Sequence, residues 1–150
     1  MFQQEDFMLQ AIREAMKGQA MNEVPVGAII VNEDKKIIAR AHNLVEKYNN
    51  PMMHAEKLVI EQALKVTKNR YLENCEIWVT LEPCMMCLGM IKLSRIKRLY
   101  YGAQDKSGNF RINDKKKSSK QSCKHSFEIY SGFSAEKCED LLKCFFKNLR

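Results

Sequence analysis

The apolar residues of the chain form two kinds of run, and each kind predicts one type of secondary structure. Apolar positions that recur every three or four residues predict amphipathic helices over residues 5–20, 52–65, 84–93 and from Ser134 onwards. Short, nearly continuous apolar runs with β-branched residues predict strands over residues 24–31, 36–41, 76–81, 96–101 and 127–130. Residues 42–50 have no clear apolar period and are expected to be a loop. Residues 102–125 also have little periodicity, and a loop of that length is expected either to be functional or to contain a short helix.

The order of these segments indicates the fold class. A short polar turn at residues 32–35 joins the first two strands and predicts an antiparallel hairpin. Such a hairpin excludes a wholly parallel sheet. We therefore expect an α/β fold, a three-layer α/β/α sandwich with a central mixed sheet of about five strands, in a single domain over residues 1–150. Ser134 is a favourable N-cap for the last helix.

Composition narrows the class of protein. The hydrophobic share of 45% and the charged share of 29% are ordinary for a soluble globular protein. No apolar run is long enough to span a bilayer, so no membrane partner is expected. The N-terminus carries acidic residues and no basic region, which argues against a signal peptide and predicts a cytoplasmic location. In the reducing cytosol the six cysteines are expected to be thiols.

Charge is unevenly distributed along the chain. The formal net charge is +7, and residues 106–124 contain seven basic residues against one acidic residue. Such a cluster fits a polyanionic partner, because neutralising phosphates releases counterions. A solvated loop that merely keeps the protein soluble explains the same charge equally well.

Metal-binding chemistry is concentrated in two short motifs, His54-Ala55-Glu56 and Pro83-Cys84-Met85-Met86-Cys87. One imidazole and two thiolates suit zinc, and three protein ligands leave its fourth tetrahedral position open for water. Bound zinc can lower the pKa of that water from about 15.7 to about 7, and Glu56 would then move the proton. Residues two apart on an ideal helix face nearly opposite ways, so Glu56 can reach this site only if His54 lies in the first, irregular turn.

Each motif has competing explanations when it is taken alone. A histidine at a helix start is often structural, and a Cys-x-x-Cys can be half of a structural zinc site or a redox dithiol. A redox dithiol gives no reason for the His-Ala-Glu motif, and the sequence has no second Cys-x-x-Cys. The spacing along the sequence does not exclude another cysteine, His42 or His125 as a fourth ligand. The combination of motifs favours a catalytic zinc.

The pair of motifs also matches a known signature. His-x-Glu followed by Pro-Cys-x-x-Cys is the signature of zinc nucleobase deaminases. The chain resembles the cytidine deaminase-like superfamily and, within it, the bacterial tRNA-specific adenosine deaminases. The resemblance extends over nearly the whole chain and includes residues 24–28, 41–43, 50–56, 79–87, 94–96, 101–103 and 141–146.

The resemblance implies both a reaction and a set of site residues. It implies one Zn²⁺ per subunit and hydrolytic deamination of adenosine to inosine at the wobble position of a tRNA anticodon. The implied zinc ligands are His54, Cys84 and Cys87, and the implied catalytic residue is Glu56. The implied substrate contacts are Asn43, Ala55, Asp105 and Phe145. From the residues alone, Asn43 could equally cap its own loop, and at least one of Phe145 and Phe146 is expected to pack in the core.

Partners and rival functions follow from the same resemblance. The implied partners are a tRNA anticodon stem-loop and a second copy of the chain in a homodimer. Met52 and Met53 depart from the small residues that the family has between its proline and histidine, which changes the expected pocket wall. The rivals are a deaminase of a free base or nucleotide, such as guanine or cytosine, and a non-catalytic zinc-stabilised RNA-binding module. A small-substrate enzyme has no need of a lysine-rich face.

Overall fold

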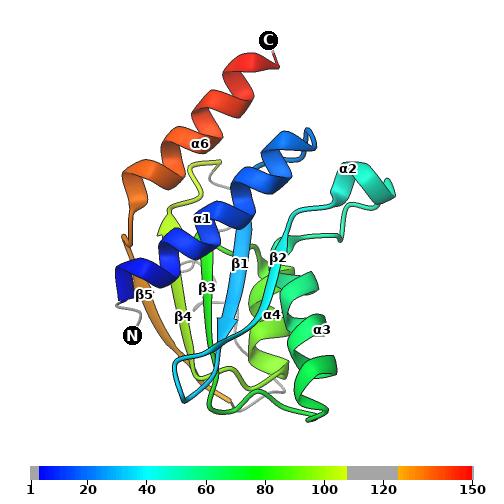
Figure 1. Cartoon of the computed structure of the whole chain (residues 1–150), viewed down its shortest axis with the longest axis vertical. Coiled ribbons are helices and arrows are strands. Elements are labelled where there is room, and N and C mark those ends of the chain that lie inside the picture. The colour runs from blue at the N-terminus through cyan, green and yellow to red at the C-terminus, as the bar shows by residue number, and fades with distance from the viewer. Residues whose placement is uncertain (1–3, 108–124, 150) are drawn as a thin grey trace.

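The computed structural model describes residues 4–107 and 125–149. Its fold is a five-stranded mixed sheet between two layers of helices (Figure 1). The strands are β1 (Gly27–Val31), β2 (Ile37–His42), β3 (Glu76–Leu81), β4 (Arg98–Ala103) and β5 (Glu128–Ser131), in the order β2-β1-β3-β4-β5. β1 is antiparallel to both β2 and β3, whereas β3, β4 and β5 are parallel. The predicted three-layer fold with a mixed sheet is confirmed.

The helices divide between the two faces of the sheet. They are α1 (Gln4–Ala20), α2 (Val45–Tyr48), α3 (Ala55–Thr67), α4 (Met85–Leu93) and α6 (Ala135–Asn148). α1 and α6 cover one face, and α3 and α4 lie together on the other, while α2 stands apart from the sheet (Figure 1). No helix among the described residues is long and apolar enough to cross a membrane.

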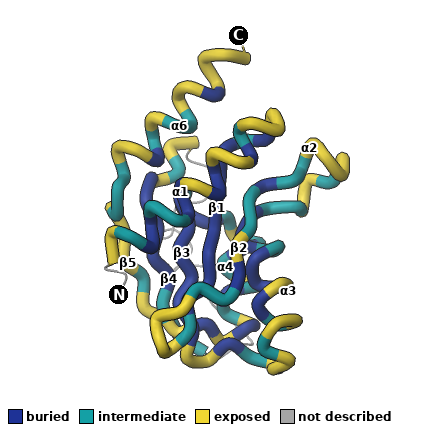
Figure 2. The backbone as a smooth tube through the Cα atoms, in the orientation of Figure 1, coloured by how far each residue is buried: buried dark blue, intermediate teal, exposed yellow. Residues whose placement is uncertain are grey.

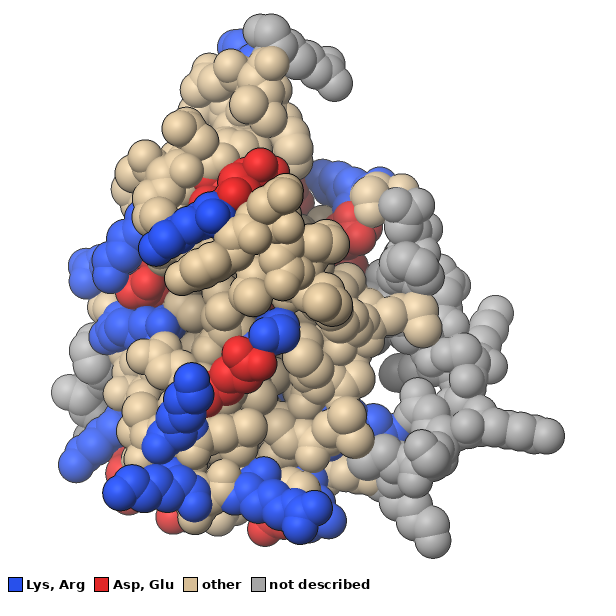
Figure 3. All heavy atoms as spheres, turned by 90° about the vertical axis from the view of Figure 1, so that its right-hand side faces the viewer, with Lys and Arg blue, Asp and Glu red and all other residues tan. Residues whose placement is uncertain are grey.

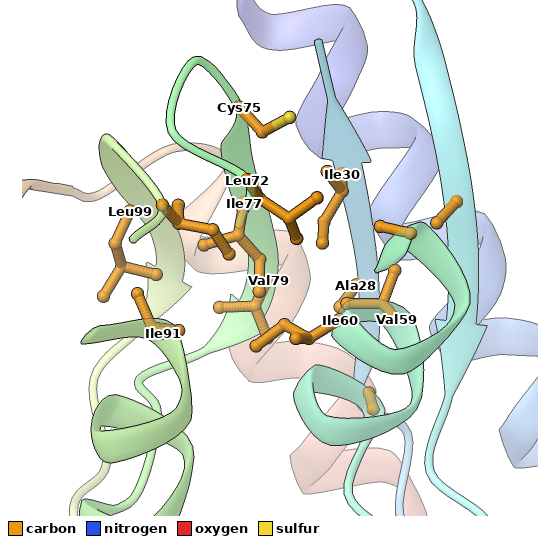
Figure 4. Packing of buried hydrophobic residues seen from close by; sticks show 14 of the residues in the cluster. Ala28, Ile30, Val59, Ile60, Leu72, Cys75, Ile77, Val79, Ile91 and Leu99 are labelled. Atoms are coloured by element: carbon orange, nitrogen blue, oxygen red, sulfur yellow. The ribbon is translucent and has the colours of Figure 1, made fainter. Parts of the chain in front are cut away.

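Two apolar clusters hold these layers together. Alternate residues of β1 point to opposite faces, so Ile30 joins the cluster with α3 and α4, whereas Ile29 joins the cluster with α1. Figure 4 shows Val59, Ile60 and Ile91 of the helices packed over β1, β3 and β4. Burial on both faces explains why β1 reads as a continuous apolar run, and Figure 2 shows the central strands as the most buried part of the chain.

α1 crosses the beginning of β1 at very short range. A Cβ atom on Gly27 would lie 2.0 Å from the backbone oxygen of Ala11 and 2.4 Å from the backbone nitrogen of Ala15. Only glycine fits this crossing, so Gly27 fixes where α1 lies on the sheet. The face of α1 that packs inward includes Phe7 and Met8, while Met16 near the end of the helix is 53% exposed.

Two local predictions differ from the structure. Residues 42–50, expected to be a loop, contain the single-turn helix α2. Ser134 precedes α6 but does not cap it, because it has a left-handed backbone (φ 48°) and its hydroxyl donates to Glu5. The long basic loop falls mainly in residues 108–124, outside the described residues. The five described cysteines form no disulfide with one another in this structure.

Candidate zinc and active site

Three side chains from the starts of two neighbouring helices converge at one point. The Nδ1 atom of His54 lies 3.6 Å from the sulfur of Cys84 and 3.5 Å from that of Cys87. The three ligand atoms all lie within 4.8 Å of one another. Within the part of the chain that is described, no fourth His, Cys, Asp or Glu joins this group. Among the described alternatives, the ring of His42 faces Asn43 and that of His125 faces Ile96.

The backbone at the helix starts explains this convergence. His54 and Cys84 each occupy the N-cap position, with extended dihedrals (ψ 149° and 174°), immediately before α3 and α4. Cys87 lies in the first turn of α4, on the side that Cys84 faces. α3 and α4 pack on the same face of the sheet and begin at the same end of it (Figure 1). The strand–proline–helix turn at Pro83 therefore brings both thiols to the histidine.

Glu56 is close enough to act in the same group. Because His54 lies outside the helix, the objection that residues two apart face opposite ways does not apply. The Glu56 carboxyl lies close enough to the Cys87 thiol for each group to shift the pKa of the other. The side chain is only 4% exposed. Burial raises the pKa of this carboxyl above its usual range. The group thus contains a buried carboxyl beside the sulfur and nitrogen ligands.

The pKa values of the three predicted ligands depend on one another through hydrogen bonds. Hydrogen bonding from Cys87 and from His54 lowers the pKa of Cys84 to about 3, although its partial burial acts the other way. Hydrogen bonding to Cys84, together with burial, raises the pKa of Cys87. Hydrogen bonding with Cys84 raises the pKa of His54. Cys84 therefore favours the thiolate form, and His54 and Cys87 donate hydrogen bonds to it.

This donor set fits zinc. Zinc prefers thiolate and imidazole ligands, and in catalytic sites it uses three protein ligands. Nδ1 of His54 and the two sulfurs supply that set, and one sulfur already favours the anionic form that a metal requires. A half-site of a Cys₄ centre would need further ligands, which the described residues do not provide.

Asn43 lies between the end of β2 and α2. The residue is 8% exposed, and its backbone N–H donates to the Val26 carbonyl at 3.1 Å. Its buried Oδ1 atom has no hydrogen-bond partner among the described residues, so it does not cap its own loop through that oxygen. A buried polar atom without a partner costs about 1–3 kcal/mol. A ligand that donates a hydrogen bond would remove that cost.

The remaining predicted contacts occupy two different environments. Ala55 is fully buried at the first position of α3. Asp105 is half-buried in the loop after β4, where its backbone N–H donates to the buried Glu82 carboxylate at 3.0 Å. Phe145 is 9% exposed and packs in the molecule, whereas its neighbour Phe146 is 49% exposed.

A separate cavity of about 760 Å³ lies between the ends of β3 and β4 and α6. Leu81, Ala103, Leu142 and Phe146 give it an apolar floor, and its rim includes the following charged residues: Asp105, Lys106, Glu139, Lys143 and Lys147. Asp105 and Phe146 therefore line one space, while Phe145 is not among its lining residues. The zinc ligands do not line this cavity.

Comparison with known proteins places this geometry in a family. A model of the cytidine and deoxycytidylate deaminase zinc-binding region matches residues 1–103. The tRNA-specific adenosine deaminase of Rickettsia bellii is 45% identical over 145 residues, which cover 95% of this chain and 99% of that protein. The chain belongs to the tRNA-specific adenosine deaminases. The predicted family, enzyme class and zinc cofactor are confirmed.

Solved structures agree with membership of the tRNA-specific adenosine deaminases. One, from work on A-to-I editing by tRNA:A34 deaminases at the wobble position of transfer RNA, has a TM-score of 0.82 and 36% identity, covering 91% of this chain and 99% of that chain. A guanine deaminase from Bacillus subtilis has a TM-score of 0.68 and 32% identity, covering 86% of this chain and 85% of that chain. The same scaffold thus occurs with a free-base substrate.

Sequence reasoning did not find two buried carboxylates near the site. Glu82 precedes Pro83 and holds the Asp105 backbone, and Glu23 holds the backbone of α2. Glu82 lies inside the recognised motif and could have been found there. The partner of Glu23 lies 23 residues away in a segment without periodicity, so no local pattern reveals it.

Proposed function

We propose that this chain uses His54, Cys84 and Cys87 to hold one Zn²⁺ and Glu56 to move protons in converting adenosine to inosine at the wobble position of a tRNA anticodon. The observation that carries the proposal is the convergence of one nitrogen and two sulfurs within 4.8 Å, beside a buried carboxyl. The near full-length similarity to tRNA-specific adenosine deaminases supports the substrate. A single deaminase domain over residues 1–150 belongs to the same proposal.

The chemistry requires proton movement at two places. Deamination replaces the C6 amino group with oxygen from water and releases ammonia, so the water must lose a proton and the departing nitrogen must gain one. When bound, zinc would supply a Lewis acid that makes water a better nucleophile. Glu56 is the buried acid–base group next to the ligands, and its carboxyl would take the proton from water and deliver it to the base.

Asn43 would orient the target base. Its buried Oδ1 can accept one hydrogen bond, which a donor on the nucleoside would supply. A duplex or stacked base cannot enter such a site, so the adenine has to be flipped out of the anticodon loop. Asp105 and Phe146 line the neighbouring cavity and would contact the RNA next to the flipped base.

Measurement of nucleosides from treated tRNA tests the reaction directly. We expect zinc-loaded protein to form inosine in tRNA with A at the wobble position and none in the same tRNA with G there, as read by mass spectrometry. Glu56→Gln should reduce inosine formation by about 100-fold or more while zinc content and tRNA binding persist. Unchanged turnover in that variant would contradict the role of Glu56.

A guanine deaminase is the second candidate, because a B. subtilis guanine deaminase shares the fold at 32% identity. The same preparation should be incubated with free guanine, and xanthine should be sought. We expect none. Xanthine without inosine would replace the tRNA substrate with a free base, whereas neither product, with tRNA bound, would favour a zinc-stabilised RNA-binding module.

A homodimer and a cytoplasmic location belong to the same proposal. α4 exposes Met85 (44%) and Leu93 (67%) beside half-buried Leu88 and Met90, which suits contact with a second copy. The five described cysteines are free thiols, which suits a reducing compartment. Sedimentation velocity of the purified protein would measure the oligomeric state, and a mass of one chain would reject the dimer.

A further inference from the structure

The side chain of Glu23 is a fully buried carboxylate that the reaction does not use. It lies in the turn between α1 and β1 and is 0% exposed. Its two oxygens accept hydrogen bonds from the backbone N–H groups of Glu46 (2.6 Å) and Lys47 (3.1 Å). Among the residues that the structure describes, no Lys, Arg or His forms an ion pair with it. A buried carboxylate is costly, so these two bonds are its compensation.

Those bonds hold a helix that has little else to hold it. α2 has a single turn and no buried residue, and Figure 2 shows it as largely exposed. Its N-cap residue, Leu44, makes no side-chain capping bond. Glu23 therefore supplies from a distance the acceptors that a Ser or Asp at the N-cap would supply locally.

α2 connects two parts of the active site. Asn43 lies two residues before it, and the chain returns at Met53 and His54, where the Leu44 N–H donates to the Met53 carbonyl at 3.0 Å. Asn43 itself is held at the β1 edge by its bond to Val26. These two bonds hold the backbone at the ends of residues 43–53, which we call the arc, but Leu44, which directly follows Asn43, is the N-cap residue of α2. Loss of the Glu23 bonds would loosen the start of α2 and the backbone next to Asn43, and so change how often the Asn43 side chain is oriented for substrate.

We propose that Glu23 is a positioning residue, which keeps residues 43–53 in the arrangement that presents Asn43 to the target nucleoside. The proposal rests on the proposed function through the role of Asn43. If a variant holds the arc correctly for only a fraction of the time, apparent affinity falls by that fraction, whereas bound substrate restores the arrangement. Glu23→Gln keeps the size of the side chain but turns one acceptor into a donor facing an N–H group. We expect KM to rise by about 10-fold and kcat to change by less than about twofold.

Glu76 provides a matched control. It is also a buried carboxylate (3% exposed), but it is the first residue of β3, at the end of the strand away from Cys84. Its carboxylate accepts hydrogen bonds from Lys35 and Arg98. Glu76→Gln should reduce the amount of folded enzyme without raising KM, because the arc of residues 43–53 is untouched. If kcat falls to a similar extent in Glu23→Gln and Glu76→Gln and KM rises in neither, Glu23 only stabilises the fold. That result would overturn the proposal.

A double mutant tests whether Glu23 acts through Asn43. Once Asn43→Ala has removed the contact, loosening the arc should cost less, so the effects of Glu23→Gln and Asn43→Ala on kcat/KM should be less than multiplicative. Glu76→Gln and Asn43→Ala should multiply. Multiplicative effects for the Glu23 pair would contradict action through Asn43.

Hydrogen exchange gives a readout that needs no activity. The amides of Glu46 and Lys47 should exchange at least about 10-fold faster in Glu23→Gln than in wild type, with unchanged exchange in β3, and Glu76→Gln should leave both amides protected. If wild type forms no inosine, the proposed function fails while this comparison still decides whether Glu23 orders α2. Unchanged exchange at both amides would overturn the proposal. If Glu23→Gln does not fold, Glu23→Asp, which keeps the charge but reaches at most one N–H, serves in the same comparison.

Discussion

At the scale of single residues, two adjacent phenylalanines on α6 separate packing from binding. Phe145 is 9% exposed and Phe146 is 49% exposed, and their rings meet edge to face with centroids 5.4 Å apart. Only Phe146 lines the cavity that Asp105 and Lys106 also border. The family resemblance indicated Phe145 as the substrate contact, but the exposed ring available to stack on a base belongs to Phe146.

Alanine at each position should therefore give opposite phenotypes. Phe146→Ala should raise KM for tRNA by about 10-fold, because stacking of a base on an aromatic ring is worth about 1–3 kcal/mol, and should leave the melting temperature nearly unchanged. Phe145→Ala should lower the free energy of unfolding by about 3 kcal/mol, through lost packing, with KM unchanged in the folded fraction. Steady-state kinetics and thermal unfolding of both variants check this, and a larger KM effect for Phe145→Ala would reverse the assignment.

Spacing in the sequence predicts some site residues and not others. His54, Cys84 and Cys87 are visible because metal ligands need fixed residue types at short intervals, and the helix starts that bring them together follow from periodicity. The burial of Asn43 and the bond between Glu23 and α2 depend on how distant segments pack. No local pattern contains that information.

At the scale of elements, α6 is attached to the sheet through a very close contact. A Cβ atom on Gly102 of β4 would lie 2.4 Å from the sulfur of Cys138 and 3.0 Å from the backbone oxygens of Phe133 and Thr80. Cys138 is 1% exposed, and burial raises the pKa of its thiol to about 11, so it packs as a neutral small hydrophobe. The glycine thus permits α6 to lie against β4.

Gly102→Ala should loosen this junction. Overpacking in a dense core costs about 1–3 kcal/mol, so we expect the free energy of unfolding to fall by that amount. The variant should therefore unfold at a lower denaturant concentration than wild type. Cys138→Ala in the same chain should recover part of the loss, because it removes the sulfur that the new methyl group meets first. Gly89→Ala is the control, since nothing lies within 4 Å of a Cβ atom there, and it should not destabilise the subunit. Additive losses in the double variant would contradict a direct contact.

Periodicity predicts the long elements to within a few residues, and it fails for α2. Among the described elements, the central strands and the four longer helices arise from apolar runs that the core requires, which is why their pattern is visible. β5 is mostly exposed, and its pattern comes from Ile129, which packs against the core from the edge of the sheet. α2 buries nothing, so selection for a core leaves no pattern in it. The predicted cap at Ser134 is wrong because its hydroxyl bonds to Glu5 on α1, a tertiary contact that overrides the local preference.

At the scale of the whole molecule, charge is spread rather than gathered on the side that carries α2 and α3. Figure 3 shows Lys and Arg scattered over that side, with fewer Asp and Glu among them. The densest basic segment of the sequence, residues 106–124, lies almost entirely outside the described residues. Lys106, Lys143 and Lys147 rim the cavity beside α6 together with Asp105 and Glu139, and Glu139 pairs with Lys106 and Lys143. The described rim therefore carries only a small excess of positive charge.

Zinc binding at the proposed site should raise the free energy of unfolding of the whole fold. Its proposed ligands lie at the starts of α3 and α4, which do not share a segment of chain, so a metal bound there is bound only by the folded molecule. At free zinc about 100-fold above the dissociation constant, binding adds about 2.7 kcal/mol to the free energy of unfolding. Removal by a chelator should then lower the melting temperature by roughly 5–11 °C for a chain of this size.

Two cysteine variants separate this coupling from a general effect of thiols. Cys84→Ser should abolish the zinc-dependent part of the melting temperature, because it removes the sulfur that is held as a thiolate. Cys144→Ser changes an exposed thiol on α6 and should retain the full zinc-dependent shift. Differential scanning calorimetry with and without chelator measures both. An equal response of wild type and Cys84→Ser to chelation would mean that the stabilising metal binds elsewhere, because the ligand set at α3 and α4 cannot close without that sulfur.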